Sequence, residues 1–216
     1  MPRVSVCSSV KNQTAWLKDM IATVVAQTFN DWELILVNDG CADEATPKIM
    51  QKFAELDKRI KVIEQPNLNR AFARNKGMDT AKGEWLCWLD CDDEYSSNYL
   101  RVLDQATKEF PEYKIFNFGS IIYRNDYSYD IRPAFTPQIE GNGHQWFRAG
   151  HIGAGSFIFR RDLWETRGLK KIAVDWDESN TAIVEEKEGQ IYRIPEEVNP
   201  YRFAAASLFD LKLDPV

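Results

Sequence analysis

Three aspartates stand within four positions in the stretch GEWLCWLDCDDEY, residues 83–95, directly after a run of large apolar side chains. An ionised carboxylate in a core loses its hydration unless a cation or a hydrogen-bond donor replaces it. The acids therefore either lie in water at the end of a strand or bind something positive. The D-x-D step of Asp90 and Asp92 suits a divalent ion such as Mg²⁺ or Mn²⁺, which takes one or two carboxylates together with substrate phosphates.

A second apolar run, LILVNDG, ends in Asp39. In open parallel sheets, ligands bind outside the carboxyl ends of the strands. Turn capping explains a single aspartate after a strand equally well, so Asp39 alone does not decide the question. The chain has neither G-x-G-x-x-G nor G-x-x-x-x-G-K-[ST], so a bound phosphate would depend on the metal and on isolated basic side chains.

The first half of the chain alternates strand and helix patterns. Apolar and β-branched runs predict strands over residues 3–10, 32–39, 60–64 and 84–90, and apolar residues at helical spacing predict helices over 14–27, around 49–56 and over 70–81. This β-α-β-α-β-α-β order predicts an α/β fold with a mostly parallel central sheet flanked by helices. We expect Trp16, Trp32, Trp85 and Trp88 in its core.

The second half reads as less regular. We expect a helix over 99–110, strands over 114–119, 120–124, 155–161, 190–195 and 200–203, and a short helix over 161–168. Residues 125–143, rich in Tyr, Pro and Gly, show neither helical nor strand periodicity and predict an ordered loop or a partly mobile cover over the acceptor site, with a surface excursion as the alternative. We predict a single domain over 1–216, with a nucleotide-type half at about 1–110 and a smaller, irregular substrate half at about 111–216.

Composition excludes several classes of protein. The 216 residues are 44% hydrophobic and carry 27 basic against 33 acidic side chains, a net charge of −6 that argues against nucleic acid as a partner. No apolar run is long enough to span a bilayer, and the first ten residues do not resemble a signal peptide. The cysteines form no C-x-x-C pair, which predicts free thiols in a reducing compartment, the cytoplasm: Cys7, Cys41, Cys87 and Cys91.

The order and spacing of several segments together resemble family 2 glycosyltransferases, which have the GT-A fold. The segments VSVCSSVKN, QTFNDWELILVNDGCAD and NLNRAFARNKGMDTAKGEWLCWLDCDDEY resemble the nucleotide-binding blocks of that family, the last of which ends in its D-x-D motif. The segments GSFIFRRDLW, VDWDES and YRIPEEVNPYR resemble its acceptor strand, the segment with its catalytic acid and its closing strands. The resemblance covers the whole chain.

The resemblance implies a hexosyltransferase-type enzyme of polysaccharide biosynthesis. It would move a sugar from a nucleotide-diphosphate sugar, UDP-linked, to a hydroxyl of a glycan or glycolipid acceptor, with inversion at the anomeric carbon. Asp175 would be the general base, with Asp177 or Glu178 as alternatives if the loop is shifted. The expected location is the cytoplasm, including the inner face of the membrane, where peripheral association would bring a lipid-linked acceptor within reach.

The resemblance also implies the binding residues. Asp92 would hold the metal, Mn²⁺ or Mg²⁺, and Asp90 would contact the metal or the ribose. The expected nucleotide-binding residues are Ser9, Lys11, Asp39, Arg74 and Asp90. The expected acceptor residues are Trp146, His151, Trp164 and Trp176. Asp93 reads as a capping acid, because two carboxylates suffice for the metal.

The chain departs from the family pattern at four positions. The family usually has Pro at Ser9, often Tyr at Lys11, commonly Asp at Asn38 and Gly at Asn69. Lys11 would exchange a stacking contact with the base for a charge near phosphate. Two other functions compete: a sugar-phosphate nucleotidyltransferase, which would need a glycine-rich basic loop near the N-terminus, and a non-catalytic relative that keeps the fold for binding.

Overall fold

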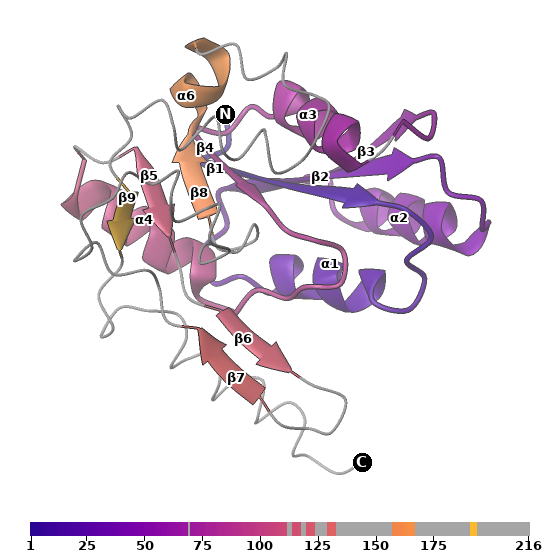
Figure 1. Ribbon diagram of the computed structural model, residues 1–216, viewed down its shortest axis with the longest axis horizontal. Helices are drawn as coiled ribbons and strands as arrows, with labels where there is room; N and C mark the ends of the chain where they lie inside the picture. Colours follow the sequence, from indigo (N-terminus) through magenta and orange to yellow (C-terminus); the bar gives the residue numbers. More distant parts are fainter. Residues whose placement is uncertain are drawn as a thin grey trace.

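Four parallel strands form the centre of the molecule (Figure 1). The computed structural model describes residues 1–68, 70–111, 114–117, 120–123, 129–132, 157–166 and 191–193. The parallel strands are β1 (Val4–Val10), β2 (Trp32–Asp39), β3 (Ile60–Gln65) and β4 (Trp85–Trp88). They lie in the order β3-β2-β1-β4, so the strand that opens the chain is central. This confirms the predicted mostly parallel α/β sheet.

The sheet continues into the second half of the chain, where one strand runs in the opposite direction to the others. Beyond β4 lie β8 (Phe157–Arg160), β5 (Ile115–Asn117) and β9 (Ile191–Arg193). Strand β8 is antiparallel to both β4 and β5, whereas β5 and β9 are parallel. A separate antiparallel hairpin joins β6 (Ser120–Tyr123) to β7 (Tyr129–Arg132).

Strand β7 corrects one prediction. We expected residues 125–143 to form an irregular loop, but Tyr129–Arg132 pair with β6, with Ile131 opposite Ile121. The alternation of Tyr129 and Ile131 is a strand pattern that the neighbouring Asp, Pro and Gly residues obscured. The remaining residues of this segment lie outside the described part of the chain.

Helices cover both faces of the sheet, as the alternating pattern predicts. On one face lie α1 (Leu17–Val25), α2 (Ala45–Leu56) and α4 (Tyr99–Glu109), and on the other lie α3 (Arg70–Thr80) and α6 (Arg161–Thr166). Each face has its own apolar cluster, because alternate side chains of a strand point to opposite faces. Val6 therefore packs toward α1, whereas Cys7 packs toward α3.

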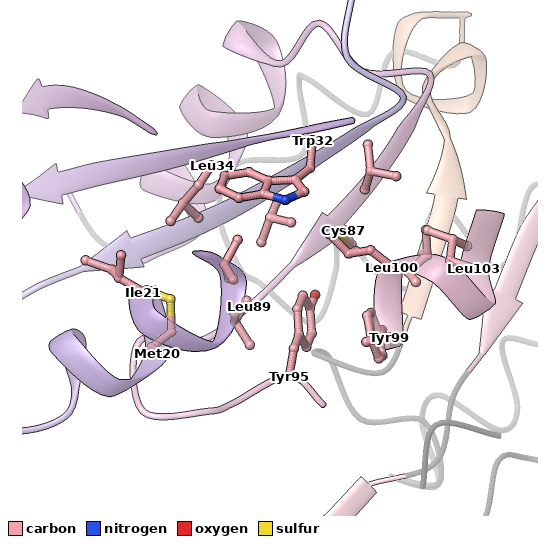
Figure 2. Packing of buried hydrophobic residues seen from close by; sticks show 14 of the residues in the cluster. Met20, Ile21, Trp32, Leu34, Cys87, Leu89, Tyr95, Tyr99, Leu100 and Leu103 are labelled. Carbon is pink, nitrogen blue, oxygen red and sulfur yellow. The ribbon is translucent and has the colours of Figure 1, made fainter. Parts of the chain in front are cut away.

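The larger cluster, on the α1 face, packs side chains of β1, β2 and β4 against helices α1 and α4. Figure 2 shows Met20 and Ile21 of α1 beside Leu34 of β2, with Leu100 and Leu103 of α4 in the same cluster. All five side chains are fully buried. Full burial of each such side chain stabilises the fold by about 1.5 to 3 kcal/mol relative to exposure.

Three of the four predicted core tryptophans are buried: Trp32, Trp85 and Trp88. The prediction for Trp16 is wrong, because this side chain is 57% exposed. Helix α1 begins at Leu17, and its buried stripe is Leu17, Met20, Ile21 and Val24. Trp16 is the N-cap residue of α1, one position before the buried stripe begins.

A buried polar network closes the edge of the sheet where the parallel strands begin, which we call the amino edge. Glu33 of β2 is 3% exposed and accepts hydrogen bonds from the Ser5 hydroxyl at 2.6 Å, the Lys82 N–H at 2.6 Å and the Lys61 ammonium. Burial alone would raise the pKa of Glu33, but these hydrogen bonds hold it below its usual value. The Ser5 hydroxyl also accepts the Gly83 N–H at 2.8 Å. The network holds the turn at Lys82 and Gly83 that leads into β4.

Candidate functional site

The described candidate residues gather at the opposite edge, which we call the carboxyl edge. Strands β2, β1 and β4 are neighbours and parallel, so Asp39, Lys11 and Asp90 at their ends lie along one edge of the sheet. Ser9, in the last part of β1, is half-buried. The topology thus brings together segments that are up to about eighty residues apart in the chain.

Asp39 is a buried acceptor at the end of β2. Its residue is 2% exposed, and its Oδ1 atom accepts hydrogen bonds from the Gln65 amide at 2.6 Å and from the Leu68 N–H at 3.1 Å. Its Oδ2 atom makes no hydrogen bond to any residue that the structure describes. A buried carboxylate with an open oxygen is suited to accept an N–H group from a ligand.

The partners of Asp39 were not predicted from the sequence. Gln65, Asn67 and Leu68 follow β3, which lies beside β2 in the sheet. Asn67 packs on Gly40, where φ is 66° and a Cβ would lie 2.7 Å from the Asn67 nitrogen. The stretch QPNLN after an apolar strand was the available signal, because Pro and Asn favour turns at strand ends.

Arg74 and Asp90 form a buried ion pair across the carboxyl edge. Arg74, on α3, is 3% exposed, and its guanidinium donates to the Asp90 carboxylate, whose side chain is 27% exposed. Burial lowers the pKa of Arg74, and the Asp90 charge opposes this shift. Asp90 is therefore the counter-charge that allows an arginine to lie inside the fold.

The residues after Asp90 form a tight, negatively charged turn, which we call the acid loop (Asp90–Asp93). The Asp93 N–H donates to the Asp90 carbonyl at 3.0 Å, and Asp92 is exposed. Loss of solvent and then the charges of Asp90 and Asp92 raise the pKa of Asp93 to about 6. Because residue 93 is exposed as a whole, we attribute more of this shift to the neighbouring charges.

The chemistry of the acid loop fits a divalent cation. Its donors are carboxylate oxygens, the ligands that Mg²⁺ and Mn²⁺ prefer. The raised pKa of Asp93 indicates negative charge that Arg74 does not fully balance. Within the described ranges, no group of three or more acidic, His or Cys side chains is arranged as a complete metal site. Two carboxylates such as Asp92 and Asp90 are a number of protein ligands that Mg²⁺ accepts when substrate phosphates supply others.

Two loops meet at the ends of β1 and β2. Asn12 adopts φ of 53°, and its side-chain oxygen accepts the Ala42 N–H at 2.8 Å. The Asn12 N–H in turn donates to the Cys41 sulfur at 3.2 Å. These contacts join the loop that carries Lys11 to the loop after Asp39. The two loops therefore support each other at this end of the site.

All four cysteines are free thiols. Burial, followed by the nearby charges of Asp92 and Asp90, raises the pKa of Cys91 to about 12, and burial raises that of Cys87 to about 12. These two thiols stay protonated at neutral pH.

The structure corrects the prediction for Trp164. We expected its ring at the acceptor site, but Trp164 is 1% exposed and its indole N–H donates to Asp79 at 3.0 Å. Helix α6 follows β8, which runs antiparallel to β4, so α6 lies at the amino edge. The Arg161 N–H donates to the Glu84 carbonyl at the start of β4. Trp164 is a core residue at the wrong end of the sheet to contact the same ligand as Asp39.

The remaining expected site residues lie outside the described part of the chain. They are the acceptor candidates Trp146, His151 and Trp176 and the base candidates Asp175, Asp177 and Glu178. Their roles stay predictions.

Comparison with known proteins shows the family of this chain. The sequence profile of the family described as Glycosyl transferase family 2 matches residues 5–168, well over half of the chain. The chain is 33% identical to EpsH of Bacillus subtilis (strain 168) over 173 residues, which are 78% of this chain and 50% of EpsH. It spans half or less of the length of this and the next curated relatives.

Solved structures share the fold at low identity. TarS of S. aureus in complex with UDP-GlcNAc superposes with a TM-score of 0.71 at 15% identity, covering 91% of this chain and 56% of TarS. The mannosyltransferase PcManGT of Pyrobaculum calidifontis, in complex with GDP-Man and Mn²⁺, gives a TM-score of 0.63 at 17% identity, covering 90% and 55% of the two chains. The match to the family profile and the shared GT-A architecture together show that this chain belongs to glycosyl transferase family 2.

Proposed function

We propose that the chain transfers a sugar from a UDP-linked donor to a hydroxyl of a glycan or glycolipid, with metal assistance and inversion at the anomeric carbon. The observation that carries the proposal is the arrangement at the carboxyl edge. An acceptor with an open oxygen, Asp39, lies at one end, and the acid loop with the Arg74–Asp90 pair lies two strands away. The base of one nucleotide would lie at Asp39, and its diphosphate would lie at the acid loop.

The candidate side chains at the carboxyl edge would each contribute to binding the donor. The open oxygen of Asp39 accepts an N–H of the base, and the Gln65 amide and Leu68 N–H hold the carboxylate in place. Arg74 orients Asp90 through their ion pair, which leaves the partly exposed carboxylate directed to the ribose or the metal. Ser9 lies on β1 between these two groups.

Asp92 and Asp90 would hold the divalent ion, Mn²⁺ or Mg²⁺. When bound, such an ion offsets the negative charge that develops on the leaving nucleoside diphosphate. PcManGT, a structural relative, was solved with Mn²⁺ and a nucleotide sugar, which supports this assignment.

We assign the proton transfer to Asp175, which the family resemblance places in the catalytic segment. It would take the proton of the acceptor hydroxyl as the oxygen attacks the sugar from the side opposite the diphosphate. A single displacement of this kind inverts the anomeric carbon. Asp177 and Glu178 are the alternatives for this role.

We further propose that residues at about 1–110 hold the donor and residues at about 111–216 build the acceptor side of one domain. Among the described helices none is long and apolar enough to cross a membrane. A cytoplasmic location, including the inner face of the membrane, stays a prediction. Family membership argues against the sugar-phosphate nucleotidyltransferase, and the non-catalytic relative is left as an outcome of the test.

The test is a thermal-shift screen of nucleotide sugars with and without Mn²⁺, followed by turnover with the best donor. A ligand that binds only the folded state raises the melting temperature. At a ligand concentration of one hundred times the Kd, the free energy of unfolding increases by about 2.7 kcal/mol. We expect metal-dependent stabilisation by a UDP-sugar and, by NMR of the first product, the opposite anomeric configuration. Retention would refute the single displacement. Binding without turnover of any acceptor or of water would indicate the non-catalytic relative.

A further inference from the structure

The residues that follow the acid loop are held to the end of helix α1. The Tyr95 N–H donates to the Thr23 hydroxyl at 3.2 Å, and the Gln27 amide donates to the Ser96 carbonyl at 2.6 Å. The Gln27 side-chain oxygen accepts the Leu100 N–H at 3.0 Å. Thr23 belongs to α1, and Gln27, which is 4% exposed, follows its last turn and also donates to the Thr23 carbonyl. The end of α1 therefore fixes the segment after the acid loop.

Tyr95 joins this fixed segment to the end of β4. Its hydroxyl donates at 3.0 Å to the carbonyl of Trp88, the last residue of β4, and Figure 2 shows the hydroxyl directed toward that strand. Its ring stacks on the Tyr99 ring of α4, with the ring centroids 4.0 Å apart and the planes 13° apart. The Leu89 N–H donates to the Cys7 carbonyl at 3.0 Å, which ties the same strand end to β1.

The hydrogen bond between Tyr95 and Trp88 closes the chain around the acid loop. These two residues flank the six residues 89–94, and the Asp93 N–H closes a smaller turn inside them by donating to the Asp90 carbonyl at 3.0 Å. The acid loop carries its carboxylates on short side chains, so the position of the backbone decides where their oxygens lie. Mg²⁺ demands ligand oxygens at 2.0–2.1 Å in near-ideal geometry, so a small shift of the loop is enough to weaken binding.

We propose that Tyr95 is a positioning residue for the divalent cation, because it holds the backbone of the acid loop where Asp90 and Asp92 bind the metal together. The inference rests on the proposed metal-assisted function. Tyr95 acts through the backbone, since its hydroxyl is bound to Trp88 and its ring is buried against Tyr99. A buried tyrosine without this role would change the stability of the fold and leave the metal affinity of the folded protein as it is.

The experiment measures the Kd of Mn²⁺ in the presence of saturating UDP, from the loss of the electron paramagnetic resonance signal of free Mn²⁺. Tyr95→Phe removes the hydroxyl and keeps the ring. Thr23→Val removes the acceptor of the Tyr95 N–H and keeps the shape of the side chain. The control is Ser5→Ala, which loses buried hydrogen bonds at the amino edge, the opposite end of the sheet from the acid loop. Urea unfolding of each variant establishes that it is folded and measures its stability.

The positioning role predicts that metal affinity and stability change separately. Tyr95→Phe should weaken Mn²⁺ binding by about 10-fold, the lower end of the 10- to 100-fold range for residues that hold metal ligands without touching the ion. Thr23→Val should weaken it in the same direction. Ser5→Ala should bind Mn²⁺ with the Kd of the wild type, although it is less stable.

Three results would overturn the inference. If Tyr95→Phe binds Mn²⁺ as tightly as the wild type, Tyr95 is a structural residue alone, and the proposed function stands. If Ser5→Ala weakens Mn²⁺ binding as much as Tyr95→Phe does, the loss follows stability and not the position of the acid loop, and again the proposed function stands. If the wild type with UDP binds no Mn²⁺, the metal-assisted function and the inference fall together.

Discussion

Asp90 and Asp92 look equivalent in the D-x-D motif, but the structure predicts different consequences for their loss. Asp90 is the counter-charge of Arg74, which is 3% exposed, whereas Asp92 is exposed and makes no hydrogen bond or ion pair to the described residues. Asp90→Asn should therefore reduce the stability of the protein itself. Asp92→Asn should leave stability unchanged and remove metal-dependent binding.

The magnitude follows from the burial of the pair. Removing one partner of a fully buried ion pair costs about 3 to 5 kcal/mol, because the remaining charge is left uncompensated. The Asp90 side chain is 27% exposed, and asparagine keeps an oxygen that accepts from Arg74. We therefore expect a loss of about 2 to 3 kcal/mol for Asp90→Asn. For the exposed Asp92→Asn we expect a change within about 0.5 kcal/mol.

Urea unfolding at pH 7.5 without metal, followed by tryptophan fluorescence, measures both losses, and the slope m must match the wild type for the comparison to hold. Binding of UDP as a function of Mn²⁺ concentration then tests the metal role. Asp92→Asn serves as the matched control for stability, because it makes the same chemical change in the same loop. Equal stability of the two variants would refute the counter-charge role of Asp90. Undiminished metal-dependent binding by Asp92→Asn would refute its assignment as a ligand.

Four further outcomes follow from described contacts. Ser5→Ala should cost about 2 to 4 kcal/mol in urea unfolding, because it removes a buried hydrogen bond to Glu33 and leaves the Gly83 N–H without its acceptor. The folded-state pKa of Glu33 is lowered, so its contribution should be complete above the unfolded pKa, near 4.3, and should be lost as pH falls through the folded value; Glu33→Gln should flatten this part of the stability profile. Trp164→Phe should lower the melting temperature through the lost bond to Asp79 but leave the KM of the acceptor unchanged, and a raised KM would restore the acceptor role. Asn38→Asp should destabilise the wild type but not Glu64→Gln, because the Asn38 amide donates to the Glu64 carboxylate at 2.6 Å; equal losses in both backgrounds would contradict this coupling.

The sequence allowed the parallel half of the sheet to be predicted because apolar and β-branched runs alternate with helical patterns, and β2 and β4 are nearly continuous apolar runs. Strand β2, WELILVND, is buried along its whole length, so its pattern does not depend on which face is considered. The ends of such strands are known once the strands are known, which is why Asp39 and Asp90 could be assigned to one edge. The four-residue strand β7 could not be predicted, since its alternation is too short to outweigh its neighbours.

The partners of the site residues were out of reach of the sequence. Which strand lies beside β2 decides that Gln65 and Leu68, rather than residues near Asp39 in the chain, hold its carboxylate. Similarly, Trp164 lies at the amino edge because β8 is antiparallel to β4. Its closeness in sequence to the expected acceptor segments had suggested a position at the acceptor site. Pairing and direction of strands depend on contacts between distant residues, and a local pattern does not encode them.

Two of the four departures from the family pattern, Asn38 and Lys11, have local partners in the fold. Asn38 stands where the family commonly has Asp, and it faces Glu64, so an aspartate there would put two carboxylates in contact. The Asn38 oxygen also accepts the Cys41 N–H at 2.9 Å, which shapes the loop after Asp39. Lys11 stands where the family often has Tyr, and its ammonium donates a hydrogen bond to the Asn67 side-chain oxygen. Asn38 contacts β3 from the end of β2, and Lys11 contacts the residues after β3 from the end of β1. The two substituted residues and their partners lie around Asp39, and neither contact reaches the acid loop, so we infer that these substitutions change how the loops around Asp39 are held together.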